Sequence, residues 1–138
     1  DARPPATPES LPKGKTLGIR SFVLTEDLWR DYIRDVRETH PLYAAEKIAH
    51  PGQLLRLCNS ALRENVVLPP WIHVGSNVRN FAVAKVGDEL SARGVVVDNY
   101  ERKGHRLVDL DVIMIANGKT VLARVLHTAI YQLRHLQG

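Results

Sequence analysis

The second half of the chain limits the possible folds more than any other part of the sequence. From Trp71 onward it contains four long segments rich in Val, Ile and Leu. Short turn signals separate these segments: Gly87-Asp88, Lys103-Gly104 and Asn117-Gly118. Asn-Gly between two apolar runs is a strong signal for a β-hairpin, and the alternation of apolar residues with Asp109 and Asp111 has the period of a strand. The sequence therefore predicts four long antiparallel strands that follow one another as a meander.

An apolar helix is predicted directly before these strands, within residues 51–66. Its apolar residues recur at helical spacing: Leu54, Leu57, Cys58, Ala61 and Leu62. Leu55 widens this stripe, so we expect much of the helix surface to be buried. Pro51 suits the first turn of the helix, where a missing N–H costs nothing, and Pro69 and Pro70 close the segment behind it.

Shorter elements are predicted nearer the start of the chain. Residues 16–24 are a strand candidate, and a helix is expected from about 26 to 37, with Thr25 as its N-cap and two acidic residues in its first turn. Pro41 prevents this helix from running on. Residues 1–15 carry four prolines and no apolar period. We therefore expect a flexible N-terminal arm, followed by one domain over residues 16–138.

A buried helix combined with long antiparallel strands has one economical arrangement, in which the sheet curls around the helix and buries it. This arrangement is the α+β hot-dog fold. Such a sheet leaves an open edge, and pairing two sheets would cover it. The sequence therefore predicts a hot-dog domain that forms a dimer, either with itself or with another hot-dog subunit.

Composition and charge argue against several classes of function. The net charge is +4, but the Lys and Arg residues are scattered, which argues against nucleic-acid binding and suits a small phosphate-bearing partner at least as well. The chain has no run of about 18 apolar residues, so no membrane span is predicted. Its single cysteine, Cys58, cannot form an internal disulfide and is expected to be an inert core thiol in a reducing compartment, the cytoplasm.

No metal or resident cofactor is predicted. The histidines lack a recognisable metal-ligand spacing, and the sequence contains neither a P-loop nor a Gly-rich dinucleotide motif. His73 and His127 lie within strand patterns and are expected to be hydrogen-bonded sheet residues. His50 precedes the apolar helix, where packing or capping of the helix start is its expected role.

Several short motifs together resemble one family. They are T-E-D-L (25–28), V-R-E-T-H-P-L-Y (36–43), I-A-H-P-G-Q-L-L (48–55), N-V-R-N-F (77–81) and V-G-D-E-L (86–90). Their order resembles that of the MaoC-like hot-dog proteins, which include (R)-specific enoyl-CoA hydratases and acyl dehydratases, over roughly residues 17–134. The resemblance implies binding of an acyl thioester of coenzyme A (CoA) or acyl carrier protein as substrate, with hydro-lyase chemistry.

The family's catalytic segment has the form D-x-N-P-x-H, and only its proline is unchanged here. Pro41 matches that proline, Glu38 stands at the Asp position, His40 replaces the Asn and Tyr43 replaces the His. Gly52 matches the glycine whose N–H polarises the thioester carbonyl in the family. The resemblance therefore implies that Glu38 and His40 share proton transfer, Tyr43 orients water or substrate, and Gly52 binds the carbonyl oxygen.

These departures leave the function open between alternatives. A phenol is a weaker general base at neutral pH than an imidazole, and the longer side chain of Glu38 displaces its carboxylate from the Asp position. The chain is either an active hydratase or dehydratase, or a non-catalytic hot-dog subunit that supports an active partner. A third hypothesis is a thioesterase in which Glu38 activates water. Three arginines are candidates for contact with the CoA phosphates, or are solvated surface residues: Arg79, Arg93 and Arg102.

Overall fold

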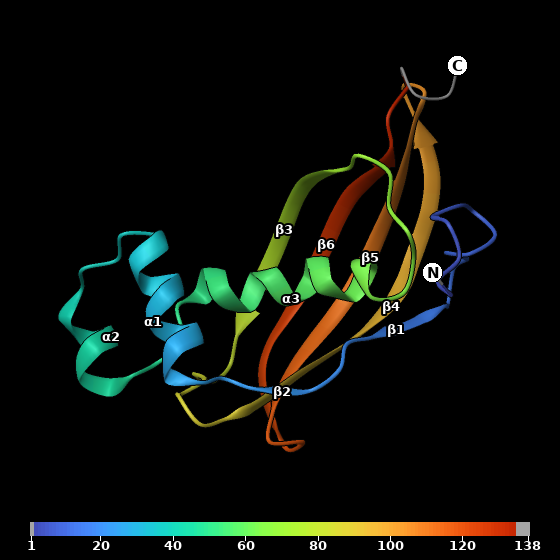
Figure 1. Cartoon of the computed structure of the whole chain (residues 1–138). Helices are drawn as coiled ribbons and strands as arrows, with labels where there is room; N and C mark the ends of the chain where they lie inside the picture. The colour runs from blue at the N-terminus through green and yellow to red at the C-terminus, as the bar shows by residue number, and fades with distance from the viewer. Residues whose placement is uncertain (1, 135–138) are drawn as a thin grey trace.

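A curved antiparallel sheet with one helix across its concave face forms the body of the molecule (Figure 1). The computed structural model describes residues 2–134. The elements are β1 (Thr16–Gly18), β2 (Phe22–Val23), α1 (Glu26–Asp35), α2 (Pro41–Glu46), α3 (Pro51–Arg63), β3 (Ile72–Asn80), β4 (Glu89–Arg102), β5 (His105–Ala116) and β6 (Thr120–Gln132). The strand order is β1-β4-β5-β6-β3, and β2 also pairs with β4. This architecture confirms the predicted hot-dog fold.

Strands β4, β5 and β6 form the expected meander, joined by two tight turns. In each turn both central residues have positive φ: 53° and 83° at Lys103-Gly104, and 56° and 68° at Asn117-Gly118. This conformation matches the twist of the flanking strands, and Asn and Gly adopt it at low cost. The even-numbered residues of β5 from Val108 to Ala116 are buried, as the alternating pattern predicts.

The first of the four predicted strands does not join this meander in sequence order. β3 pairs with β6 at the far edge of the sheet instead of with β4, and it ends at Asn80. The turn at Gly87-Asp88 does form, with the Asp88 N–H donating to the Lys85 carbonyl, but it reverses the connecting segment 81–86 rather than β3 itself. The predicted position of this strand was wrong because turn signals report local reversals and not which strands pair.

Helix α3 lies across the sheet and supplies one side of the core. Its apolar stripe is buried against the concave face: Leu54, Leu57, Cys58, Ala61 and Leu62. Met114 of β5 and Val125 of β6 are fully buried on the opposing face. The predicted central helix is thus confirmed.

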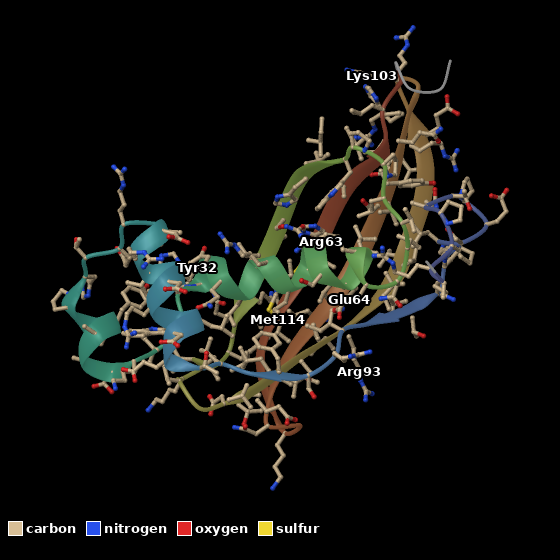
Figure 2. The ribbon with its side chains drawn as sticks, in the orientation of Figure 1. Tyr32, Arg63, Glu64, Arg93, Lys103 and Met114 are labelled. Carbon is tan, nitrogen blue, oxygen red and sulfur yellow. The ribbon has the colours of Figure 1, made fainter. Side chains whose placement is uncertain are left out.

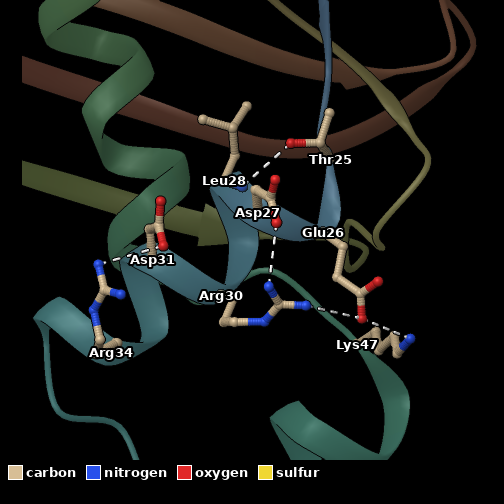
Figure 3. Close-up of polar contacts among 8 residues, drawn as sticks. All are labelled: Thr25, Glu26, Asp27, Leu28, Arg30, Asp31, Arg34 and Lys47. Carbon is tan, nitrogen blue, oxygen red and sulfur yellow. Dashed lines mark hydrogen bonds and ion pairs between the residues drawn. The ribbon is translucent and has the colours of Figure 1, made fainter.

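Helices α1 and α2 lie together beside the N-terminal end of α3, to one side of the sheet (Figure 1). The hydroxyl of Thr25 caps α1 by accepting the Leu28 N–H at 3.2 Å, as predicted. Glu26 pairs with Lys47, which follows α2, at 2.9 Å (Figure 3). The sequence did not predict α2, which begins at Pro41 and has no buried residue.

The N-terminal residues 2–15 are packed onto the domain, and the expectation of a flexible arm is corrected. Leu11 is fully buried in the main core. The Val67 N–H donates to the Pro4 carbonyl at 2.8 Å, and the Asn99 side chain donates to the Leu11 carbonyl at 3.0 Å. The segment is therefore not a free arm, because one buried leucine and these hydrogen bonds hold it against the domain. Within the described part of the chain, no helix is long and apolar enough to cross a membrane.

Candidate functional site

The carboxylate of Glu38 and the imidazole of His50 lie together at the N-terminal end of α3. Oε1 of Glu38 is 3.7 Å from Nε2 of His50, and both side chains are about one quarter exposed, at 29% and 27%. Nδ1 of His50 accepts the Gly52 N–H at 3.0 Å, which caps α3. Because Nδ1 is an acceptor in this bond, the ring proton of the neutral form is on Nε2, facing Glu38.

The end of α1 brings Glu38 to this position. Arg37 has a φ of 56°, its N–H donates to the Arg34 carbonyl, and the Glu38 N–H donates to the Ile33 carbonyl. These two bonds form a Schellman motif with arginine where glycine is usual, at a cost of about 1 kcal/mol. A second left-handed residue, Lys47 with a φ of 49°, ends α2. Arg37 and Lys47 thus lie at the two ends of residues 38–46, the segment that connects α1 to the start of α3 and includes Glu38.

Two tyrosines flank the His50 ring. The Tyr43 ring stacks on it with centroids 5.3 Å apart, and the Tyr32 ring lies at 5.6 Å and is tilted. Tyr32 is buried on α1 and lies at the N-terminal end of α3 (Figure 2). The guanidinium of Arg56 sits over the Tyr32 ring, 4.5 Å from its centroid. Tyr32 was not among the predicted site residues because its spacing on α1 marks it only as a core residue.

Gly52 fits this site because it has no side chain. A Cβ added here would overlap the Tyr32 hydroxyl. The close approach of Tyr32 to the helix backbone therefore requires glycine, for a reason independent of backbone dihedrals. The Gly52 N–H, to which the resemblance assigns the thioester carbonyl, donates to His50 in this structure.

No hydrogen bond or ion pair joins His40 to Glu38. Its Nδ1 accepts the Leu42 N–H at 3.1 Å and so caps α2, and its exposed ring meets Tyr43 edge-on with centroids 6.3 Å apart. The structure thus brings Glu38, Tyr43 and Gly52 together around His50, with His40 on the outer side of Tyr43. The sequence showed His50 as a helix cap, and this is confirmed, but its pairing with Glu38 was missed.

A second histidine cluster lies on the concave face of the sheet. The Ser76 hydroxyl is 2.8 Å from Nε2 of His73 and 3.0 Å from Nδ1 of His127, and the two rings stack with centroids 4.4 Å apart. His127 is buried, and its Nε2 has no hydrogen-bond partner among residues 2–134. Burial, reinforced by the charge of His73, lowers the pKa of His127 to about 4. Both histidines are hydrogen-bonded sheet residues, as predicted.

Cys58 is a core thiol. It is fully buried on the inner stripe of α3, and burial raises its pKa to about 12. The thiolate is the reactive form of cysteine, so this environment makes the side chain inert, as predicted.

Within residues 2–134, no group of three or more His, Cys, Asp or Glu side chains is arranged to hold a metal ion.

Solved structures share this fold at low sequence identity. A monoamine oxidase regulatory protein from Archaeoglobus matches with a TM-score of 0.78 and 17% identity, over 95% of this chain and 97% of that chain. The (R)-hydratase of A. caviae matches with a TM-score of 0.71 and 18% identity, over 88% and 98%. The HadBC (3R-hydroxyacyl-ACP dehydratase) complex of Mycobacterium tuberculosis matches with a TM-score of 0.71 and 17% identity, over 86% and 96%. No protein-family model and no curated protein sequence matches the chain. The chain therefore has the hot-dog fold in the form found in MaoC-like dehydratases and (R)-hydratases.

Proposed function

We propose that the chain binds an acyl thioester of CoA or acyl carrier protein, and that Glu38 and His50 carry the proton transfers of a hydratase or dehydratase. The observation that supports this proposal is the distance of 3.7 Å between the Glu38 carboxylate and Nε2 of His50 at the start of α3. The pair combines a carboxylate with an imidazole, as the Asp and His of the family motif do. His50 thus offers the imidazole that is missing at position 43.

Hydration adds water across the double bond next to the thioester. The water oxygen bonds to the β-carbon, the π electrons move toward the α-carbon, and the α-carbon takes a proton. The active form would carry protons on both nitrogens of His50 and none on Glu38. Glu38 then accepts the proton from water, and His50 donates the Nε2 proton to the α-carbon. Transfer of the proton from Glu38 to Nε2 restores the starting state, and dehydration follows the same steps in reverse.

The same protonation releases the Gly52 N–H. Once Nδ1 of His50 carries a proton, it can no longer accept the Gly52 N–H, to which it is hydrogen-bonded at 3.0 Å. That N–H is then available to the thioester carbonyl oxygen, on which negative charge develops in the transition state. Charging of His50 would therefore prepare both the acid and the oxyanion donor in one step.

The proposed partner is a second hot-dog chain that pairs along β3. This strand is a sheet edge, and its side chains Ile72 and Val74 are about half exposed, at 48% and 54%. An exposed apolar edge strand is a template for pairing with another strand. The HadBC neighbour is itself a complex. The observations suit a homodimer and a heterodimer equally well.

A non-catalytic subunit is the alternative that one specific observation favours. In this structure the Gly52 N–H is occupied by His50. If that bond persists in solution with ligand bound, the thioester carbonyl has no donor at this position. The chain would then keep the fold and support an active partner subunit.

Turnover measurements with crotonyl-CoA and longer enoyl-CoA thioesters test the proposal. A hydratase lowers the enoyl absorbance, whereas a thioesterase releases free thiol. Glu38→Gln should lower the hydration rate by about a hundredfold or more, because general acid–base catalysis commonly contributes that much. Glu46→Gln removes an exposed carboxylate from α2 and is the matched control. Binding of acyl-CoA without turnover at high protein concentration would establish the non-catalytic alternative.

A further inference from the structure

The convex face of the sheet, opposite α3, carries a row of arginines across four strands. In the strand register Arg93 of β4 lies beside Ile113 of β5, Ile113 beside Arg124 of β6, and Arg124 beside Arg79 of β3. Their buried neighbours along β5 and β6, such as Val112 and Val125, point to the concave face, so this row points outward. Three of its four positions are therefore cationic.

Arg79 and Arg124 are direct cross-strand partners with the same charge. Like charges at this position destabilise a sheet. Asp111 offsets the charge of only one of them, Arg124. The Asp111 carboxylate accepts two hydrogen bonds from Arg124, at 3.0 and 2.6 Å, and these bonds hold the pKa of Asp111 below its usual range. Among residues 2–134, no carboxylate forms an ion pair with Arg79. The pair thus keeps an excess positive charge that the fold itself does not need.

A hollow opens on the surface at this pair. It has a volume of about 300 Å³ and is lined by Asn77, Arg79, Arg124 and Leu126. Among residues 2–134, its polar lining comprises two guanidinium groups and one carboxamide, and the Asp111 carboxylate adjoins it through its hydrogen bonds to Arg124. The bidentate bond to Asp111 holds Arg124 in place, which leaves its remaining N–H groups in a defined position before any ligand arrives.

We propose that this hollow is a binding site for a phosphate group, separate from the Glu38–His50 site. Planar guanidinium forks match the oxygens of phosphate and bind them in pairs, and the Asn77 amide adds a further donor. Binding of a dianion would also remove the repulsion between Arg79 and Arg124. The chemistry is the same for free inorganic phosphate and for a phosphate of a larger ligand such as CoA, so the experiment separates these sources.

Two arginine variants from the same row test the site. Calorimetric titration at constant ionic strength would measure the affinity of inorganic phosphate, and separately of CoA and adenosine 3′,5′-bisphosphate. Arg79→Gln should weaken phosphate binding about tenfold or more, the amount expected for lost hydrogen bonds to a charged group. Arg93→Gln removes the same charge from the same row but does not line the hollow. It should change the affinity for inorganic phosphate less than about twofold.

Equal losses in both arginine variants would show a diffuse electrostatic field and overturn the proposal, as would the absence of phosphate and CoA binding to the unmodified chain. Asn77→Leu is a second, uncharged probe and should weaken binding without changing the net charge. If the chain binds inorganic phosphate but not CoA or the bisphosphate, the ligand of the site is the free ion. If Arg79→Gln loses affinity for CoA and the bisphosphate, the ligand is a phosphate group carried by a larger molecule of this kind. Glu38→Gln should leave phosphate affinity unchanged, so failure of the proposed catalytic pair and failure of this site are distinguishable.

Discussion

The Glu38 carboxylate faces Nε2 of His50 at 3.7 Å, while Nδ1 of the same ring holds the Gly52 N–H. One imidazole therefore connects the carboxylate of Glu38 with the backbone donor at the start of α3. This relationship distinguishes His50 from His40, which caps the neighbouring helix α2.

Replacing His50 by asparagine should separate its catalytic role from its capping role. The Asn side chain can still accept the Gly52 N–H, because Asn is a good N-cap, but it offers no group at the Nε2 position. We expect thermal stability to change little and the hydration rate to fall about a hundredfold or more. His40→Asn is the matched control, since it preserves the cap of α2 in the same way. An equal loss of rate in His40→Asn would instead assign proton transfer to His40, as its position in the motif implied.

Gly52→Ala should destabilise the chain because its methyl group overlaps the Tyr32 hydroxyl. Overpacking of this kind costs about 1–3 kcal/mol in the free energy of unfolding, measurable by urea denaturation. In a Tyr32→Phe background the overlap with the hydroxyl is removed and a close approach of 3.2 Å to Nδ1 of His50 remains, so alanine should cost clearly less stability there than in the unmodified chain. The double-mutant cycle is therefore expected to show a coupling of at least about 1 kcal/mol. Additive effects of the two substitutions would contradict the close contact.

His127 should make stability depend on pH. Its pKa is lowered from 6.5 to about 4 in the folded state, mainly by burial. Between these values the unfolded chain binds a proton that the folded chain does not, so stability falls as the pH is lowered through this window. The loss is up to about 3 kcal/mol. Between pH 7 and pH 4.5, His127→Gln should lose less stability than the unmodified chain, and the difference between the two losses should be most of this amount. Urea denaturation at both pH values measures them. Identical losses would mean that His127 is not buried as a neutral ring.

Leu11→Ala should destabilise the whole domain although residue 11 belongs to the proline-rich start of the chain. Leu11 is fully buried, and truncation of a buried leucine to alanine costs about 2–5 kcal/mol. A flexible arm would show no effect. Lys13→Ala is the matched control, because this neighbouring residue is exposed. Both variants can be compared by thermal unfolding.

Local patterns in the sequence were sufficient to predict most of the sheet and the central helix. The alternation along residues 105–116 and the turn at Asn117-Gly118 depend on neighbouring residues only, so β5 and its hairpin follow from them. The apolar stripe of residues 54–62 likewise identifies the buried face of α3. The position of β3 beside β6 was not predictable in this way, because strand pairing at a sheet edge depends on contacts between residues far apart in the chain.

By itself, then, the sequence determined the hot-dog fold, which follows from periodicity and turn chemistry, and its motifs named Glu38, His40, Tyr43 and Gly52 as candidate site residues. Only the tertiary structure placed His50 against Glu38 and Tyr32 against Gly52. The reason is that two left-handed residues, Arg37 and Lys47, redirect the chain between these groups. Neither arginine nor lysine predicts that conformation from sequence, because non-glycine residues adopt it only when the surrounding packing offsets its cost.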